Sequence, residues 1–550
     1  MLFEYAQYFL SLAGWRFPAS TSEIIDYLNT SSAGQQLPIV DLGYALYYNF
    51  SNIRFAAPPL GQLRFQAPEL PLDERSSGVQ DGQIGYTCPQ SLTAWVVTMD
   101  ENGTPLNQTG NVTYEIPPHT ADENEDCLFL DVVVPEAAMP TATAKPAKKG
   151  APVLVWIYGG GYIMGSKSYW GNPSGLLAHN YASGREDMIF VSFNYRLGVF
   201  GWLAGPSVES DGTSNAGLYD QQMALEWVQK YIHLFGGDPD RVTVMGESAG
   251  GGSIITHIIA SGVASRPKAL FHQAIIQSPG LVKPATHAEA QSYHDDFLRV
   301  LNVESLAEAR QLSSDVLIRA NDEVLFGAPF GQFLFGPAID SVYLPDNPSK
   351  LLAAGKYDQN MKIMLGHCPN EGHQFTPDIT TEEEVKDFLH GFFRYSDSAT
   401  VEYIRTVLYP PIYDGMLPYT TTRGRLDLMY SEYVFTCHTA HVSHVFGNKT
   451  YNYQYNNSYG YHTDDVGPTF MNGNESWGWQ GIVNHTQASM LQEYITAFVV
   501  EGTPNAAHKI REFPVYRAES TILALSSEGE HIKKDPNANA RCDFWNTGAL

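Results

Sequence analysis

Short apolar runs separated by helix-compatible segments constrain the fold of this chain more than any other feature. The runs are continuous rather than alternating, which is typical of strands covered on both faces of a sheet. They span Leu128 to Val134, Val153 to Tyr158, Met188 to Phe193, Val242 to Met245, Ala274 to Gln277 and Lys362 to Leu365. Between two of these runs, Gly217 to Phe235 carries its apolar residues largely on one helical face. This alternation predicts an α/β fold with a large, mostly parallel central sheet flanked by helices.

The length of the chain bears on the number of domains. Single hydrophobic cores usually stop growing at about 250–300 residues. This chain has 550 residues, so it forms either several domains or one large sheet with long insertions. It shows no repeat of fixed period and no long linker, only an Ala/Lys/Pro patch from Thr141 to Pro152 that reads as an exposed loop. We expect a single domain over residues 1–550, with a poorly defined N-terminal segment at residues 1–36.

The charge of the chain excludes several classes of partner. Lys and Arg total 33 against 59 Asp and Glu, which gives a formal net charge of −26. A field of this sign repels phosphate backbones and anionic membranes. No window reaches the roughly 18 consecutive apolar residues of a membrane-spanning helix. The sequence therefore predicts a globular protein with no nucleic-acid partner and no integral membrane segment.

One segment carries a recognisable nucleophile motif. Residues Asp240 to Gly252 read as a strand that runs into Gly246-Glu247-Ser248-Ala249-Gly250 and then into a helix-compatible stretch. Small flanking residues allow a sharp turn that exposes the Ser248 hydroxyl, and the following helix directs its N–H groups and positive dipole end at the site. The alternative interpretation is a glycine-rich turn with an incidental serine. The strand-to-helix context favours Ser248 as a catalytic nucleophile.

A second glycine motif supplies candidate donors for the oxyanion of a reacting ester. Gly159-Gly160-Gly161 follows the strand ending at Tyr158 and precedes the nucleophile in the chain. Backbone N–H groups that no Cβ obstructs can bind a developing negative charge. We expect the N–H groups of Gly160, Gly161 and Ala249 to form the oxyanion hole, with a plain turn as the alternative for the glycines.

Together, these and further segments resemble signatures of the type-B carboxylesterase/lipase family, in its fungal branch. The segments are WIYGGGY from Trp156, NAGLYDQQMALEWV from Asn215, FGGDPDRVTVMGESAGG from Phe235 and EDCLFLDVVVP from Glu125. The likeness runs from Phe55 to Asn546. It implies an α/β-hydrolase fold and the hydrolysis of carboxylic esters through a Ser-Glu-His triad without a cofactor. Small-molecule or lipid esters would be the substrates.

The resemblance also implies the other two triad members. Asn370-Glu371-Gly372 matches the family's acid motif, so Glu371 would orient and stabilise the imidazolium. His462 lies in a segment that resembles the family's H-x-x-D/E pattern, and the chain order Ser248, Glu371, His462 is that of α/β-hydrolases. Asp340 and Asp464 are the reserve candidates for the acid. A solvated surface glutamate and an ordinary loop histidine are the alternatives.

The chain contains five cysteines, so at least one is free or pairs between chains, and the residues alone leave the pairing open. The resemblance implies that Cys88 pairs with Cys127, closing a lid-like loop over residues 88–127, and that Cys437 pairs with Cys542. Cys368 is left over. Within the loop we expect the apolar stretch Leu92 to Met99 to shelter against the mouth of the acyl pocket, with a static loop packed on the core as the alternative.

Two weaker features favour a secreted protein. Tyr8 to Trp15 resembles a short signal core, although no basic residue precedes it. Nine N-x-S/T sequons are candidate glycosylation sites in a secretory route, at Asn29, Asn49, Asn102, Asn107, Asn111, Asn448, Asn456, Asn474 and Asn484. Chance occurrence in a chain rich in Asn, Ser and Thr is the alternative. We predict a secreted or secretory-pathway location.

Taken together, these features predict a serine carboxylic ester hydrolase. One alternative is an acyltransferase or tailoring esterase of a biosynthetic pathway that uses the same triad with an alcohol acceptor. A non-catalytic adhesion relative would typically have lost the nucleophile or its partners, which this chain retains. A cholinesterase is disfavoured because choline recognition needs an aromatic face, and Thr120 to Asp126 contains no aromatic residue.

Overall fold

A ten-stranded sheet runs through the computed structural model, which describes residues 47–71, 82, 85–97, 118–139, 149–169, 172–262, 269–457, 459–472, 484–506 and 511–548. The strand order is β1-β2-β4-β3-β5-β6-β7-β8-β9-β10. The strands are β1 (Tyr47–Arg54), β2 (Phe129–Pro135), β3 (Ala151–Ile157), β4 (Ile189–Phe193), β5 (Gly237–Glu247), β6 (Gln273–Gln277), β7 (Lys362–His367), β8 (Tyr451–Asn456), β9 (Thr521–Ser526) and β10 (Gly529–Lys534).

The sheet is parallel at its centre and antiparallel at its edges. All pairings from β4 through β3, β5, β6, β7 and β8 to β9 are parallel. The pairs β1–β2, β2–β4 and β9–β10 are antiparallel. Every residue of β3 and β4 is buried, as the continuous apolar runs predicted for strands covered on both faces. The predicted α/β class with a mostly parallel sheet is confirmed.

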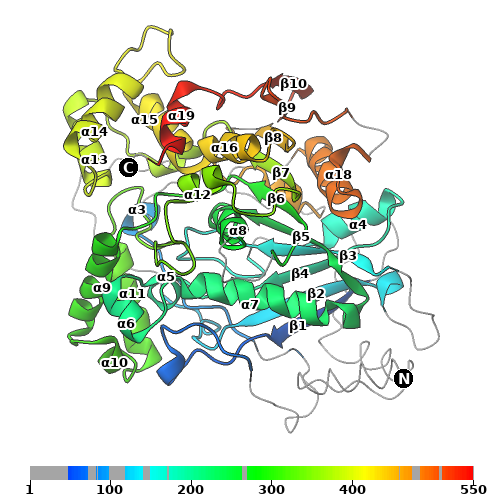
Figure 1. Cartoon of the computed structure of the whole chain (residues 1–550), viewed down its shortest axis with the longest axis horizontal. Helices are drawn as coiled ribbons and strands as arrows, with labels where there is room; N and C mark the ends of the chain where they lie inside the picture. Colours follow the sequence, from blue (N-terminus) through cyan, green and yellow to red (C-terminus); the bar gives the residue numbers. More distant parts are fainter. Residues whose placement is uncertain are drawn as a thin grey trace.

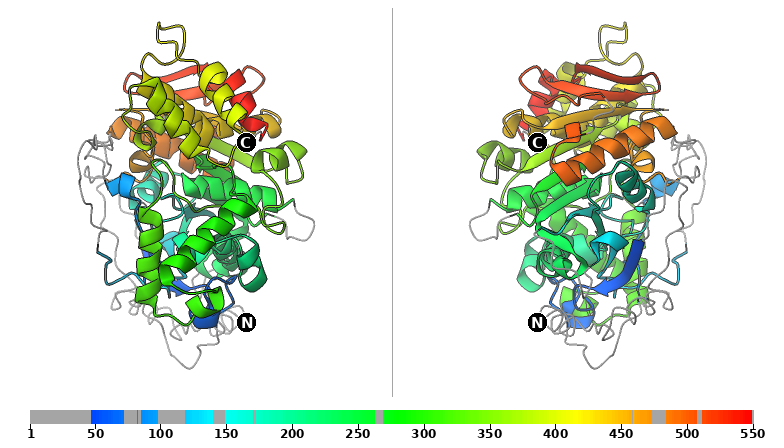
Figure 2. Two further views of the ribbon diagram at one scale, coloured as in Figure 1. Left: turned by 90° about the vertical axis from the view of Figure 1, so that its left-hand side faces the viewer. Right: turned by 90° about the vertical axis from the view of Figure 1, so that its right-hand side faces the viewer.

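Helices cover both faces of this sheet (Figures 1 and 2). On one face, α8 packs on β5, β6 and β3, and α7 contacts both β5 and α8. On the other face, α18 packs on β3 and on α4. These helices span α4 (Ser174–Ala182), α7 (Ala216–Tyr231), α8 (Ala249–Ala260) and α18 (His485–Glu501). The main hydrophobic core therefore lies in two layers, one on each side of the sheet.

Further helices gather at one end of the sheet and form a second, smaller core (Figure 1). This core joins α13 (Glu382–Phe392), α14 (Ser398–Tyr403), α15 (Thr422–Tyr430), the start of α16 (Cys437–Val445) and α19 (Ala540–Asn546). Between α15 and α16 the chain makes a π-helical segment, Ser431–Thr436. Near these helices lie α9 (His287–Leu301) and α11 (Ser314–Phe326), which pack on each other.

Several expectations fall on residues that the structure does not describe. They are the segment at residues 1–36, the signal-like stretch at residues 8–15, the middle of the lid-like loop at residues 98–117 and five sequon asparagines, Asn29, Asn102, Asn107, Asn111 and Asn474. The other four sequon asparagines are described. Asn49 lies within β1, Asn448 precedes β8, Asn456 ends β8, and the Asn484 side chain accepts hydrogen bonds from the first N–H groups of α18.

Candidate active site

Ser248 occupies a sharp turn between β5 and α8. Its φ of 54° and ψ of −122° lie outside the conformations that L residues usually adopt. The turn depends on its small neighbours, because a Cβ at Gly246 would lie 2.8 Å from the Ile157 carbonyl oxygen and one at Gly250 only 2.0 Å from it. The turn places Ser248 directly before the N-terminus of α8, at the surface of a cavity. The Ser248 residue is 9% exposed.

The triple-glycine loop after β3 approaches this serine closely. A Cβ at Gly159 would lie 2.8 Å from the Ser248 Cβ, so only glycine allows the approach. Gly160 and Gly161 have φ values of 117° and 61°, which favour glycine. A Cβ at Gly161 would fall 2.3 Å from the ring of Phe333. Gly161, Ser248 and Ala249 line the same cavity, and Gly160 adjoins them in the loop.

Glu371 and His462 form a buried pair at the ends of neighbouring strands. Glu371 follows β7 and His462 follows β8, and the two segments are joined by a bridge between Asn370 and Tyr461. The Glu371 Oε2 lies 2.5 Å from the His462 Nδ1. The other carboxylate oxygen accepts hydrogen bonds from the Ser278 hydroxyl and the Cys368 N–H, both at 2.6 Å. With no exposed surface, Glu371 holds the imidazole in one orientation.

The imidazole lies between two carboxyl groups, the second of which sequence reasoning missed. The Glu247 Oε1 lies 3.2 Å from the His462 Nε2. Burial raises the pKa of Glu247 well above its usual range, and the nearby charges of Asp465 and Glu371 raise it further. A raised pKa favours the uncharged acid, which attracts the imidazole less than a carboxylate does. The position of Glu247 beside Ser248 in the motif was the signal available in the sequence.

The two reserve acids have hydrogen-bond partners in other parts of the structure. Asp464 accepts a hydrogen bond from the Tyr461 N–H, and burial raises its pKa to about 7. Asp340 accepts a hydrogen bond from the Asn215 side chain and binds three backbone N–H groups of its own loop. Both therefore stabilise loop geometry, and neither takes the place that Glu371 occupies beside Nδ1.

The cavity beside Ser248 has a volume of about 150 Å³ and a largely aromatic wall. The rings that line it come from separate parts of the chain: Tyr162, Tyr293, Phe333, Phe335, Phe375, Phe392, Phe393, Tyr395, Tyr430, Tyr433 and Phe435. Two of these rings also contact the histidine, with centroids 4.2 Å (Phe435) and 5.3 Å (Phe375) from the imidazole. An ester bound here would have its acyl or alcohol part in apolar surroundings.

Trp95 packs against two of the aromatic residues that form this wall. It lies in α3 (Ala94–Val97), is 3% exposed, and packs against Phe330, Phe333 and Phe375. Its indole N–H donates to the Gln332 carbonyl. The described part of the apolar stretch therefore packs in a buried cluster through Trp95, next to residues that line the cavity.

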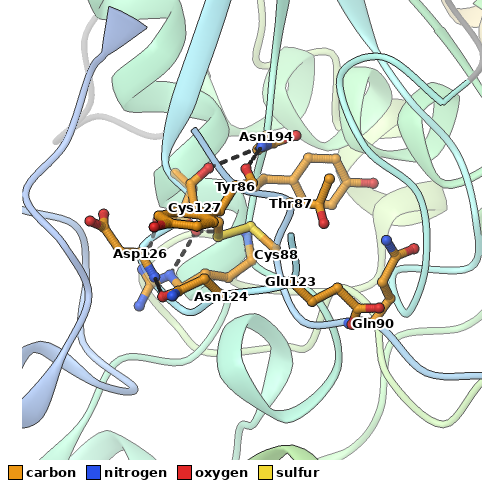
Figure 3. Close-up of a disulfide and its surroundings, with 12 residues drawn as sticks. Tyr86, Thr87, Cys88, Gln90, Glu123, Asn124, Asp126, Cys127 and Asn194 are labelled. Carbon is orange, nitrogen blue, oxygen red and sulfur yellow. Dashed lines mark hydrogen bonds and ion pairs between the residues drawn. A yellow bond between two sulfur atoms is a disulfide. The ribbon is translucent and has the colours of Figure 1, made fainter. Parts of the chain in front are cut away.

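Two disulfides brace the surroundings of the site, with the pairings that the resemblance implied. Cys88 is joined to Cys127 (Figure 3), and Cys437 to Cys542. The Asn194 side chain donates to the carbonyls of Tyr86 and Cys127 and so ties the two ends of the lid-like loop together (Figure 3). Cys368 is a buried free thiol, whose pKa burial raises well above its usual range.

Within the described ranges, no group of three or more His, Cys, Asp or Glu side chains is arranged to hold a metal ion. Among the helices that the structure describes, none is long and apolar enough to cross a membrane.

Comparisons with known proteins show which family this chain belongs to. The model of the carboxylesterase family matches residues 32–545. The chain is 39% identical to carboxylesterase patB of Penicillium expansum over 93% of this chain and 96% of that protein. It is 30% identical to a secreted lipase of Arthroderma benhamiae over 76% and 82% of the two chains.

A solved structure matches the same architecture. Aspergillus niger EstA superposes with a TM-score of 0.75 at 25% identity, covering 94% of this chain and 99% of that one. The α/β-hydrolase fold that the sequence implied is therefore confirmed. Because the family model spans nearly the whole chain, this protein belongs to the carboxylesterase family and is a hydrolase of the carboxylesterase/lipase type.

Proposed function

We propose that the protein hydrolyses carboxylic esters through an acyl-enzyme on Ser248, with His462 as the base and Glu371 as its orienting acid. One observation carries this proposal: a serine on a strained strand-to-helix turn lines an apolar cavity, and the buried pair of Glu371 and His462 lies at the ends of strands in the same sheet. Acyl transfer requires a nucleophile, a base and oxyanion donors, and these residues would supply all three.

In the proposed reaction, His462 takes the proton of the Ser248 hydroxyl through Nε2 while the serine oxygen attacks the ester carbonyl carbon. The N–H groups of Gly160, Gly161 and Ala249 bind the oxygen that becomes negative in the tetrahedral intermediate. Collapse of that intermediate breaks the bond to the alcohol oxygen, which receives the proton from His462. Water then repeats the sequence on the acyl-enzyme and releases the acid.

Glu371 has two functions in this scheme. Its carboxylate holds the Nδ1 proton, so that Nε2 is the free base, and it stabilises the imidazolium that forms in each half-reaction. The hydrogen bonds from Ser278 and Cys368 fix the carboxylate while it does so. Glu247 on the other side favours the uncharged form because its pKa is raised, so it adds no full negative charge beside Nε2.

The proposal is tested by labelling with a fluorophosphonate and mapping the modified peptide. We expect a single labelled residue, Ser248, and loss of ester hydrolysis in step with labelling. Labelling of another serine, with activity lost at the same rate, would place the nucleophile elsewhere. Product analysis with an added alcohol distinguishes hydrolysis from transfer, because a transferase forms a new ester where a hydrolase forms the free acid.

We also propose that the protein passes through the secretory pathway and that its sequon asparagines are glycosylated. The two disulfides and the secreted lipase relative support this location, since disulfides persist mainly in oxidising compartments. Peptide mapping under non-reducing conditions, together with a mass shift on deglycosylation, tests it. Reduced Cys88 and unmodified sequons in protein from its native host would contradict the proposal.

A further inference from the structure

The rim of the aromatic cavity carries two cationic side chains for which the described residues supply no ion-pair partner. Lys283 lines the cavity together with Tyr293 and Tyr395. The guanidinium carbon of Arg394 lies 4.7 Å from the ring centroid of Tyr395 and 5.8 Å from that of Tyr293. None of the ion pairs in the described part of the chain includes Lys283 or Arg394. In a chain of net charge −26, Lys283 and Arg394 thus bring positive charge to one side of the aromatic cavity.

The carboxylates in the neighbourhood have other partners. Glu289 also lines the cavity, but its carboxylate accepts a hydrogen bond from the Thr286 N–H and caps the start of α9. Asp397 caps the start of α14 by accepting from the Thr400 N–H. Both negative charges are thus held by helix N-termini, which stabilise them. They leave the cations available to a ligand.

A smaller cavity behind Lys283 offers no carboxylate either. It has a volume of about 30 Å³, shares Val282, Lys283 and Tyr433 with the large cavity, and has no Asp or Glu in its lining. The imidazole that lines it, His438, is neutral near neutral pH because burial lowers its pKa to about 4. Among the described residues, Glu289 is thus the only carboxylate that shares a cavity lining with the half-buried Lys283, and it is engaged at the start of α9.

We propose that the enzyme prefers esters that carry a carboxylate away from the scissile bond, bound at this rim by Lys283 and Arg394. This inference rests on the proposed function, because it assigns a substrate class to the same cavity. The aromatic rings would contact the apolar body of the ester, while the ammonium and guanidinium would bind its acid group.

The backbone limits how far the acid group can be from the ester. The Gly280 N–H donates to the Ser248 carbonyl at 2.7 Å, so Gly280 lies next to the nucleophile. Lys283 is three residues further along, and an extended chain of that length spans at most about 10 Å. The Lys283 main chain is fixed by a hydrogen bond from its N–H to the Tyr433 hydroxyl. A substrate acid group several bonds from the carbonyl carbon would match this geometry.

The test compares matched pairs of charged and neutral esters. On the acyl side the pair is p-nitrophenyl hydrogen adipate and p-nitrophenyl hexanoate. On the alcohol side it is p-carboxyphenyl butyrate and phenyl butyrate. For each pair, the measured quantity is the quotient of kcat/KM for the acid ester over kcat/KM for the neutral ester. The pair with the higher quotient identifies the half of the substrate that carries the acid group.

We expect Lys283→Met to lower this quotient about tenfold on one of the two pairs, since it removes a charge-assisted contact and keeps the aliphatic stem. Arg394→Gln should lower it about threefold, because an exposed cation contributes less. Lys283→Glu should lower it further than Lys283→Met, and Lys283→Arg should retain most of it. Lys386→Met, at an exposed lysine of α13 that pairs with Glu383, is the matched control and should leave the quotient unchanged.

A quotient that is the same in wild type, Lys283→Met and Lys283→Glu on both pairs would overturn the inference. If Lys283→Met does not fold, the difference between Lys283→Arg and Lys283→Gln decides the question. This outcome differs from a failure of the proposed function. The proposed function would fail if the Ser248→Ala variant hydrolysed the neutral esters as fast as the wild-type enzyme does.

Discussion

The catalytic end of the sheet and the wall of the cavity are built in different ways. At the sheet, backbone conformation does most of the positioning: Ser248, Gly160 and Gly161 all have positive φ values, and Glu371 and His462 follow adjacent strands. The wall consists of side chains from four or more separate segments, held by contacts among rings. The comparison teaches that short local motifs position the candidate catalytic residues, whereas long-range packing builds the wall of the cavity beside them.

The largest expected effect removes the nucleophile from the catalytic end. Ser248→Ala should lower kcat by a factor of about 10⁴–10⁶, because the residual rate then comes only from the remaining groups of the site. Steady-state hydrolysis of p-nitrophenyl butyrate measures it, with thermal unfolding as a check that the fold persists. A loss of only a few-fold would show that the local motif does not carry the chemistry.

The second change, Gly161→Val, affects both a proposed oxyanion donor and the aromatic wall of the cavity. Gly161→Val places a side chain where the Phe333 ring lies and restricts a residue at φ 61°. We expect kcat to fall by about 10²–10³, the effect of losing one oxyanion donor. Gly391→Ala in α13 is the control, since a Cβ there meets nothing within 4 Å. Turnover close to wild type in the Gly161 variant would mean that the donors lie elsewhere.

The third change tests the wall alone. Trp95→Phe removes the hydrogen bond to the Gln332 carbonyl and part of the ring that supports Phe333. We expect KM for long-chain esters to rise about three- to tenfold while the acetate ester is little affected, since a large substrate uses more of the apolar surface. Trp227→Phe, a buried tryptophan of α7, is the control. An equal loss on short and long esters in Trp95→Phe would place Trp95 among purely structural residues.

The smallest expected effect concerns stability. The pKa of Asp464 is raised to about 7 in the folded protein, above its ordinary value of 3.8. The folded state therefore binds the proton more tightly, and stability should increase as the pH falls through about 7 and decrease as it rises. Asp464→Asn should remove part of this dependence, seen as a difference of a few degrees in Tm between about pH 8 and about pH 5. An unchanged pH profile of Tm would indicate that Asp464 is ionised throughout.

The sequence predicted those strands of the sheet that short continuous runs of apolar residues mark. All six predicted strand runs overlap strands of the sheet, since buried strands need continuous apolar residues. The edge strands β1 and β10 lack that signal; β10, for example, is the partly exposed segment GEHIKK. The strand β9, TILALS, carries a short buried apolar run that was not among the six. A solvent-facing edge strand shows no apolar run.

Predictions for the site followed the same division. The positions of Ser248, Glu371 and His462 were anticipated from motifs, and the structure brings Glu371 into contact with His462. The approach of Glu247 to the imidazole and the cationic rim depend on side chains that meet only in three dimensions. Lys283 and Arg394 are more than a hundred residues apart and share no pattern, so periodicity and spacing could not have found them.

The π-helical segment Ser431–Thr436 presents Tyr433, Val434 and Phe435 to the cavity, and a later part of the chain clamps it from behind. Arg541 pairs with Glu432, and Cys542 is joined to Cys437 across a sequence separation of 105 residues. Arg541 and Cys542 are therefore synthesised long after the π-helical segment that they hold in place. A nascent chain that has been synthesised as far as Val445 already contains every residue of the turn at Ser248. The wall of the cavity acquires its contacts with Arg541 and Cys542 only after α19 has been synthesised. Order of synthesis thus separates the turn that carries Ser248 from the fastening of the cavity wall.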